Sequence, residues 1–274
     1  MNKLQKTEFE ILKEFDEICR MLELPYFLVC GSALGTVKYG GFIPWDDDVD
    51  VAMYREDYQR FLKEAPALLP KHLFLQNYRS DPAFPQIFSK LRNSDTTYIE
   101  TSVAKLPIHH GVYIDVFPLD GFPEGKLQRK CLIFRKRLLA SMLLSVCDVQ
   151  RAGLARVTYP IFHAMGVRKH TAVIADAYER LISSFPVKGS KVICNHGNWQ
   201  GSLEYAPAWH YGKGTQMTFE GLTVQVPECY DEYLSQKYGD YRQDLPECEK
   251  QGHHYYTVCD CDHPYTQYIV KTEV

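Results

Sequence analysis

The 274-residue chain lacks long hydrophobic runs and an excess of positive charge. Its longest apolar stretch, residues 138–147, is too short to span a bilayer, since a membrane-spanning helix needs about 20 residues. The 31 Lys and Arg are outnumbered by 34 Asp and Glu, so we expect no general attraction to nucleic acid or to anionic membranes. The N-terminal residues are charged throughout and contain no apolar signal-peptide core, so no secretory signal is expected.

The nine cysteines form no regular disulfide framework. They are odd in number and scattered, and two of them, Cys30 and Cys194, lie in apolar runs. This pattern predicts reduced thiols in a cytoplasmic protein. Internal repeats, low-complexity tracts and clear linkers are missing as well, so we expect one domain over residues 1–274. Within it we expect a core at 1–125, a basic helical and loop insertion at 126–215, and a strand-and-helix segment at 216–274.

The hydrophobic pattern predicts an α/β (α+β) fold in which helices flank a mixed sheet. Residues 7–22 have the spacing of an amphipathic helix that begins in a capping box of Thr7 and Glu10. Residues 111–120 alternate as a strand does, and residues 230–239 follow a helical pattern that ends at Gly239. Helical spacing over residues 126–184 predicts an elaborated, helical C-terminal half.

An acidic cluster interrupts a run that otherwise has the pattern of a buried strand, GFIPWDDDVDVAM at residues 41–53. It consists of Asp46, Asp47, Asp48 and Asp50, and such carboxylates repel one another and resist leaving water unless a cation cancels their charge. Alternate residues of a strand share a face, so we expect Asp48 and Asp50 to point the same way and Asp46 to extend their row. Such a row can bind Mg²⁺ or Mn²⁺ together with substrate phosphate.

A second element favours a phosphate site over a solvated acidic turn. The stretch VCGSALG ends a strand with Gly31 and Ser32, whose backbone amides and hydroxyl can hold a phosphate at the start of the next helix. A Gly-Ser turn followed by Asp-x-Asp on the next strand is the combination of nucleotidyltransferase-fold enzymes. Asp115, on a later apolar strand, offers the third carboxylate of that fold. The sequence therefore predicts transfer at phosphorus with a divalent cation.

Four blocks of the sequence, in the same order, resemble the LicD family, the bacterial relatives of fukutin and fukutin-related protein. They are GSALGTVKYGGFIPWDDDVDVAM, KLRNSDTTY, HHGVYIDVFPLDGFP and FEGLTVQVPECYDEYLSQKYGDYRQDLP. The resemblance covers residues 24–124 and 218–265, whereas residues 126–215 match no motif. It implies a nucleotidyltransferase-like fold.

The resemblance also implies an activity, the transfer of a phospho-alcohol from a CDP-activated donor to a sugar hydroxyl with release of CMP. For LicD proteins the usual donor is CDP-choline and the acceptor is a cell-surface glycan precursor, as in lipopolysaccharide, teichoic acid or capsule biosynthesis; fukutin relatives use CDP-ribitol. Carried over by motif position, the site comprises the metal ligands Asp46, Asp48 and Asp50, the donor-phosphate turn Gly31-Ser32, and Asp115 as third ligand or general base. Asp48, Asp50 and Asp115 are thus the implied catalytic residues.

Two other functions stay open from the sequence. A nucleotidyltransferase that attacks an NTP and releases pyrophosphate would use the same metal strand. A non-catalytic protein that binds glycan or nucleotide could retain the fold, although the presence of all three catalytic carboxylates argues against it. Nucleic acid processing is disfavoured by the acidic balance and by the lack of a basic aromatic groove.

Several further side chains are candidates for substrate binding. Lys90 and Arg92 are two positions apart on a predicted strand, so their side chains share a face. There the Arg guanidinium could bind a phosphate through two parallel hydrogen bonds. The alternative is that both residues form salt bridges on an exposed strand. Lys38 is a cation of the same kind. His110, beside His109, precedes the Asp115 strand and could orient an acceptor. Trp45 stands next to the acidic run and could face a quaternary ammonium or pack in the core.

Two segments leave their role open. Residues 126–170 carry ten Lys and Arg against the single acid Asp148, which predicts either a solvated basic helix face or an electropositive surface for donor phosphates or a lipid-linked acceptor. We therefore expect a cytoplasmic protein that at most contacts the inner face of the membrane. Near the end, the segment with His253, His254, Cys259, Cys261 and His263 lacks standard zinc spacing, so a zinc site and an irregular packed segment remain alternatives.

Overall fold

The computed structural model describes residues 1–149, 155–197, 201–252 and 254–269. The strands are β1 Phe27–Leu28, β2 Asp50–Tyr54, β3 Leu73–Gln76, β4 Ser89–Asn93, β5 Thr97–Glu100, β6 Val112–Gly121, β7 Val192–Asn195, β8 Tyr205–Pro207, β9 Thr215–Phe219, β10 Leu222–Val226 and β11 Tyr256–Asp260. The helices are α1 Lys3–Met21, α2 Cys30–Tyr39, α3 Arg55–Glu64, α4 Lys126–Leu144, α5 Ala155–Ala164, α6 Thr171–Ile182 and α7 Tyr230–Tyr238.

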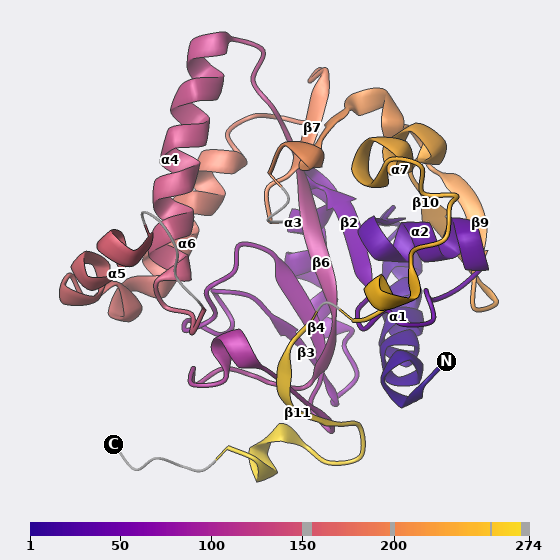
Figure 1. Cartoon of the computed structure of the whole chain (residues 1–274), viewed down its shortest axis with the longest axis horizontal. Helices are drawn as coiled ribbons and strands as arrows, with labels where there is room; N and C mark the ends of the chain where they lie inside the picture. The colour runs from indigo at the N-terminus through magenta and orange to yellow at the C-terminus, as the bar shows by residue number, and fades with distance from the viewer. Residues whose placement is uncertain (150–154, 198–200, 253, 270–274) are drawn as a thin grey trace.

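A mixed sheet forms the centre of the molecule, with the strand order β1-β2-β6-β4-β3 (Figure 1). β2 and β6 run parallel, and their other neighbours in this sheet are antiparallel. β7 continues the sheet from the end of β6 and pairs with β8. The long strand β6 therefore joins the N-terminal half of the chain to the segment that follows α6. The prediction of a mixed sheet flanked by helices is confirmed.

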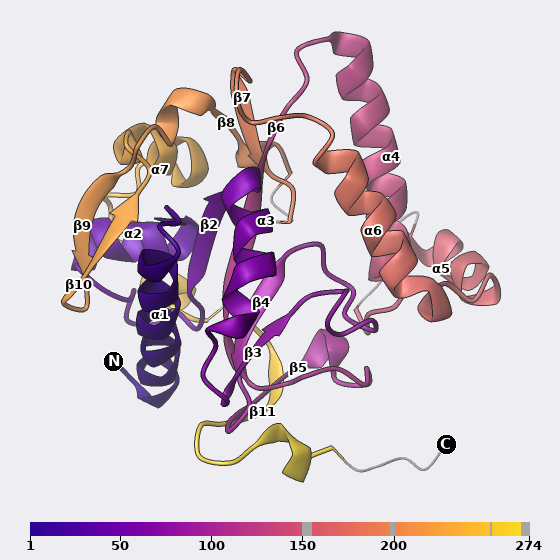
Figure 2. The same ribbon diagram turned by 180° about the vertical axis from the view of Figure 1, so that it is seen from behind.

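Helices α1 and α3 cover one face of the sheet (Figure 2). The packing is apolar, because Phe15 of α1 and Phe61 of α3 contact each other edge to face and lie in one buried cluster with Val51 of β2 and Ile114 of β6. Burying side chains of this size contributes about 1.5–3 kcal/mol each, so this layer stabilises the sheet that carries the site. α2 and α7 lie together to the side of β2, while α4, α5 and α6 form a separate layer beyond β6 (Figures 1 and 2).

The N-terminal helix begins four residues earlier than predicted. Its capping box consists of Asn2 and Gln5, whose side chains accept hydrogen bonds from each other's backbone amides at 2.9 and 3.0 Å. The Thr7–Glu10 capping box is therefore wrong, and Thr7 lies inside the helix, where its hydroxyl donates to the Lys3 carbonyl. An Asn-x-x-Gln pair makes the same reciprocal bonds as the Ser/Thr-x-x-Glu pattern that the prediction sought.

The acidic strand is shorter than predicted, because β2 begins only at Asp50 and Asp46, Asp47 and Asp48 lie in the irregular segment before it. Asp48 and Asp50 therefore do not share the face of one strand. Further along the chain, the predicted helix at residues 230–239 is confirmed, since α7 is capped at its C-terminal end by Gly239, which has a positive φ of 68°. None of the described helices is long and apolar enough to cross a membrane.

Candidate active site

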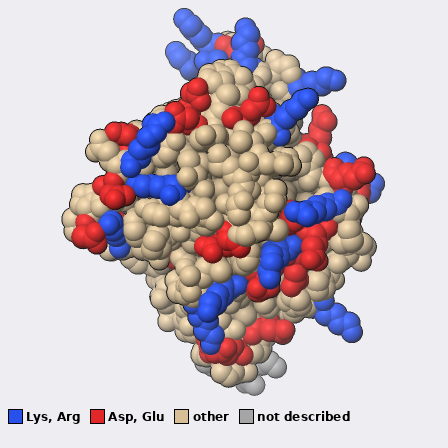
Figure 3. All heavy atoms as spheres, turned by 90° about the vertical axis from the view of Figure 1, so that its right-hand side faces the viewer, with Lys and Arg blue, Asp and Glu red and all other residues tan. Residues whose placement is uncertain are grey.

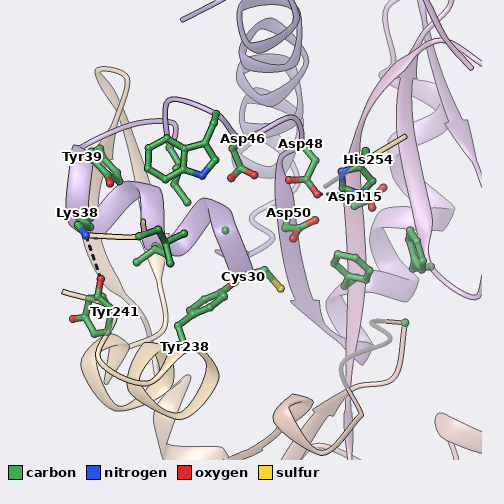
Figure 4. Close-up of a pocket in the computed structure, with 18 of the residues that line it drawn as sticks. Cys30, Lys38, Tyr39, Asp46, Asp48, Asp50, Asp115, Tyr238, Tyr241 and His254 are labelled. Atoms are coloured by element: carbon green, nitrogen blue, oxygen red, sulfur yellow. Dashed lines mark hydrogen bonds and ion pairs between the residues drawn. The ribbon is translucent and has the colours of Figure 1, made fainter. Parts of the chain in front are cut away.

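A cavity of about 580 Å³ opens where the start of α2, the acidic segment, strands β4 and β6, and the chain after α7 meet (Figure 4). Its walls thus come from segments that are far apart in the sequence. The structure brings most of the predicted site residues to this one space: Gly31, Lys38, Trp45, Asp46, Asp48, Asp50, Lys90 and Asp115. Figure 4 shows Asp46, Asp48, Asp50 and Asp115 pointing toward the same region from different elements.

Three charged residues form a row across the sheet at the floor of the cavity. Asp50 of β2 is the register partner of Asp115 on β6, and Asp115 is the partner of Lys90 on β4. Partners in register point to the same face, so the three side chains stand side by side. The Lys90 ammonium lies 2.9 Å from Asp115 Oδ1 and 3.6 Å from Glu100 Oε1. Lys90 therefore offsets part of the negative charge of the site.

Gly31 and Ser32 lie in the first turn of α2 rather than in a turn before the helix, and from there they position the start of the acidic strand. Ser32 is buried, and its Oγ accepts a hydrogen bond of 2.9 Å from the backbone amide of Asp50. The Asp50 carbonyl in turn accepts from the Val29 amide at 3.0 Å. Gly31, by contrast, borders the cavity, and a Cβ at this position would come within 2.8 Å of Asp46 Oδ2. Gly31 thus allows the carboxylate to approach the turn, while Ser32 holds the backbone behind it.

We expect Ser32→Ala to lower both stability and activity, because the buried Asp50 amide loses its acceptor. An orphaned buried donor costs about 1–3 kcal/mol, and we expect kcat to fall about 10-fold as the Asp50 carboxylate loses its fixed position. Urea unfolding and steady-state kinetics measure the two effects. Ser184→Ala, which alters an exposed serine at the end of α6, serves as the control. Wild-type kinetics and stability in Ser32→Ala would show that the turn does not position Asp50.

The carboxylates are too crowded to ionise normally without a cation. Burial, together with the charges of Asp48 and Asp47, raises the pKa of Asp46 to about 8. Burial also raises the pKa of Asp50 well above its usual range, and Asp48 and Asp115 add to this shift. Burial raises the pKa values of Asp48 and Asp115 as well. A divalent cation would remove this penalty, so the cluster fits a metal centre better than a structural ion-pair network.

Two residues were not assigned to this site from the sequence: Asp47, named only as part of the acidic cluster, and His254, considered only for a zinc site near the C-terminus. His254 reaches the cavity from the C-terminal segment, where its Nδ1 lies 3.1 Å from Asp47 Oδ1 and its backbone amide donates to Asp47 Oδ2 at 3.0 Å. Its Nε2 lies 3.6 Å from Asp48 Oδ2. Although burial alone would lower the pKa of His254, the hydrogen bond with Asp47 and the charge of Asp48 raise it to about 10.

These contacts define a group that could hold a metal ion. Ligand atoms of Asp47, Asp48 and His254 all lie within 4.8 Å of one another, and no other such group occurs among the residues that the structure describes. The cysteines of the same C-terminal segment, Cys259 and Cys261, belong to no metal group among the described residues, and the ring of His263 instead contacts Asp260 at 2.8 Å. His253, the remaining member of the predicted zinc cluster, lies outside the described residues.

Three predicted substrate-binding residues are not brought to the cavity: Ser32, which is buried against the Asp50 amide, and Arg92 and His110. Arg92 has no exposed surface; its guanidinium donates to the Gly111 carbonyl at 2.7 Å and to Glu100 Oε2 at 3.1 Å. It shares a strand face with Lys90 as predicted, but β5 brings Glu100 over this end of the strand and encloses it. His110 is buried as well, and its Nε2 lies 3.2 Å from the Leu106 carbonyl. Arg92 and His110 therefore contribute to packing around the site.

Aromatic side chains line the mouth of the cavity, and two lysines lie over their rings. Its lining includes Trp45, Tyr39, Tyr238 and Tyr241. The Lys250 ammonium lies 5.3 Å from the centre of the Trp45 ring, and the Lys38 ammonium lies 5.8 Å from that of Tyr39. Lys38 also donates to the Gln243 carbonyl at 2.8 Å and pairs with Asp244 at 2.8 Å, so it fastens the segment after α7 beside the cavity.

The geometry can support chemistry at a phosphate group. Carboxylates able to hold a divalent cation, a cation on the sheet and a glycine turn converge on one cavity, which is what transfer at phosphorus requires. The aromatic mouth adds a surface suited to a cationic head group.

Comparison with known proteins agrees with this arrangement. Residues 23–135 match the LicD/FKTN/FKRP nucleotidyltransferase domain. Over 270 residues the chain is 29% identical to the lipopolysaccharide cholinephosphotransferase LicD of Haemophilus influenzae, an alignment that covers 93% of this chain and 96% of that protein. An uncharacterized protein of Rickettsia typhi is 31% identical over 58 residues, which cover 21% of this chain and 19% of that protein. An uncharacterized protein of Rickettsia prowazekii is 33% identical over 49 residues, which cover 18% of each chain. The resemblance of the sequence blocks is thus confirmed: residues 23–135 match the LicD-type domain, and nearly the whole chain is similar to a LicD protein.

Proposed function

We propose that the protein transfers phosphocholine, or a related phospho-alcohol, from a CDP-alcohol to a hydroxyl group of a cell-surface glycan or its precursor, and releases CMP. The observation that carries this proposal is the cavity itself, in which Asp48, Asp50 and Asp115 face an aromatic mouth. The similarity to a lipopolysaccharide cholinephosphotransferase over nearly the whole chain supports the same reaction class.

We assign the metal to the acidic cluster and propose Mg²⁺, or Mn²⁺, as its identity. Asp48, which belongs to the group with Asp47 and His254, would supply a carboxylate oxygen, and Asp46 and Asp50 would add further oxygens, the ligands that Mg²⁺ prefers. Asp47 would keep His254 against Asp48, since it contacts both the ring and the backbone of that histidine. When bound, the metal neutralises the charge that develops on the transferred phosphate and on the leaving CMP.

The side chains then perform the transfer as follows. The acceptor hydroxyl oxygen attacks the phosphorus that bears the alcohol, the bond from this phosphorus to the bridging oxygen breaks, and CMP departs with that electron pair. Asp115 accepts the proton of the hydroxyl as general base. Lys90, which lies 2.9 Å from Asp115, orients this carboxylate and offers positive charge to the phosphate oxygens. The turn at Gly31 holds the donor phosphate close to the backbone.

The donor identity can be tested at the aromatic mouth. We expect Trp45→Ala to raise KM for CDP-choline about 5- to 30-fold and to leave KM for CDP-glycerol nearly unchanged, because only the quaternary ammonium gains from a ring face. Trp209→Ala is the matched control, since Trp209 is an exposed tryptophan outside the cavity. Equal increases for both donors would contradict a choline-binding role of Trp45.

The reaction itself is tested with a donor panel. Metal-stripped protein, with and without added Mg²⁺ or Mn²⁺, is incubated with a bacterial glycan extract and CDP-choline, CDP-ethanolamine, CDP-ribitol, CDP-glycerol or CTP. We expect CMP release with one CDP-alcohol only, dependent on both metal and glycan. Pyrophosphate release from CTP would instead identify an NTP-dependent nucleotidyltransferase.

We further propose that the transfer takes place in the cytoplasm and that the acceptor is lipid-linked. The described structure contains no disulfide between its cysteines, as is usual for a reducing compartment. A lipid-linked acceptor would bring the enzyme to the inner face of the membrane.

A further inference from the structure

An apolar stripe runs along the exposed side of α4. Leu127, Cys131, Phe134 and Leu138 recur at the spacing of a single helix face, and all four are exposed. Leu127 is 79% and Phe134 is 70% exposed, values that are unusual for such large apolar side chains. The buried side of the same helix packs elsewhere, since Leu143 lies in a cluster with Tyr178 and Ile182 of α6. The exposed stripe is therefore additional to what the fold requires.

Helix α5, which lies near the C-terminal end of α4, also exposes an apolar stripe. Val157 and Ile161 are exposed at adjacent turns of one face, and Met165 follows them immediately after the helix. Phe162 points the other way and joins the buried cluster with Leu143, which anchors α5 to the layer of α4 and α6. Two neighbouring helices thus each expose an apolar stripe while their opposite sides are packed.

The charges around these stripes have one sign. Lys130, Arg135 and Arg137 are exposed and lie beside the α4 stripe on the helix. Residues 126–170 contain ten Lys and Arg and a single acid, Asp148, which pairs with Lys105 at 2.6 Å. The opposite side of the molecule, shown in Figure 3, mixes Lys and Arg with Asp and Glu. The basic charge is therefore concentrated on the helices that carry the stripes, although the chain as a whole is acidic.

We infer that α4 and α5 dock on an anionic lipid surface, with the apolar stripes inserted at the interface and the flanking Lys and Arg against lipid phosphates. Helices with an apolar stripe bordered by Lys and Arg are suited to lie in the membrane interface. Basic residues near an anionic leaflet are attracted to its surface and add to the insertion of the apolar side chains. A second copy of this chain is a poorer occupant, because it would bring the same positive charge against this surface. This inference does not depend on the proposed reaction.

Vesicle sedimentation tests the inference without any activity measurement. The full chain is mixed with phosphatidylcholine vesicles, with or without 30% phosphatidylglycerol as an illustrative composition, and the bound fraction is measured. We expect binding only to the anionic vesicles and weaker binding as salt is raised, because screening removes the lipid attraction. Binding to neither vesicle, or equal binding to both, would overturn the inference.

Two sets of variants separate the apolar and basic contributions. Leu127→Glu combined with Phe134→Glu places charges in the stripe, and we expect vesicle affinity to fall at least about 10-fold. Lys130→Glu with Arg135→Glu removes flanking charge and should weaken binding to a similar extent. Leu68→Glu, at an exposed leucine outside these helices, is the control. If the stripe variant binds like wild type, or if it only converts a dimer to a monomer in light scattering, the lipid assignment is wrong.

Discussion

Replacing Asp50 or Asp48 by Asn is expected to lower kcat on the order of 10³-fold while the protein remains folded. Each change removes a carboxylate that would bind the metal, so the charge on the transferred phosphate is no longer neutralised. The fold should not suffer, because Asp50 is buried and Asp48 is partly buried beside other carboxylates: burial, with the charges of Asp48 and Asp115, raises the pKa of Asp50. Removing one of these charges relieves repulsion, so we expect Tm to stay the same or to rise.

Steady-state kinetics at saturating metal and donor, together with thermal unfolding, measure this pair of effects. Asp95→Asn is the matched control, because Asp95 is an exposed aspartate in the turn between β4 and β5. A fall in kcat that comes with a fall in Tm would point to a structural role of the carboxylates. Near-normal kcat in either variant would remove that residue from the metal centre.

Replacing Arg92 by Met is expected to have the largest effect on stability, a loss of about 3–5 kcal/mol in the free energy of unfolding. The change leaves the partly buried Glu100 with a weaker counter-charge and the buried Gly111 carbonyl without its donor. Arg92 and Lys90 together lower the pKa of Glu100 to about 2, although burial opposes this shift. We expect KM for the donor to change little in the folded fraction.

Urea unfolding gives the stability of the Arg92→Met variant, and kinetics below the unfolding transition give its KM. Arg60→Met is the control, since Arg60 pairs with Glu64 at the surface, where such a pair contributes little. A stable variant with a strongly raised donor KM would instead place Arg92 in the donor site, as its strand position first suggested.

The acidic residues of the site could be predicted because they lie close to one another in the sequence. Asp46, Asp48 and Asp50 stand close together in the sequence, and Gly31 with Ser32 follows a strand at a recognisable spacing. Period-2 alternation also placed Lys90 and Asp115 on strands, although only the register of β4, β6 and β2 shows that they meet Asp50. Local spacing thus predicted which residue types gather, but not which neighbours they contact.

The remaining features depend on contacts between distant segments. Asp47 and His254 are 207 positions apart, and no pattern around either residue indicates the other. The enclosure of Arg92 depends on β5, which itself is completed by pairing with β11 near the end of the chain. The late start of the acidic strand likewise involves another element, because Ser32 of α2 fixes the Asp50 amide. Sequence periodicity reports which face a residue occupies, not what covers it.

The fate of a labelled donor tests the central proposal most directly. Protein with Mg²⁺ and a bacterial glycan is incubated with CDP-choline labelled in the choline methyl groups, and the glycan and nucleotide products are separated. We predict that the label moves to the glycan while unlabelled CMP appears in equal amount, and that Asp50→Asn prevents both. Label that remains on CDP-choline, or a transfer that Asp50→Asn leaves intact, would contradict the assignment of the acidic cavity as the transfer site.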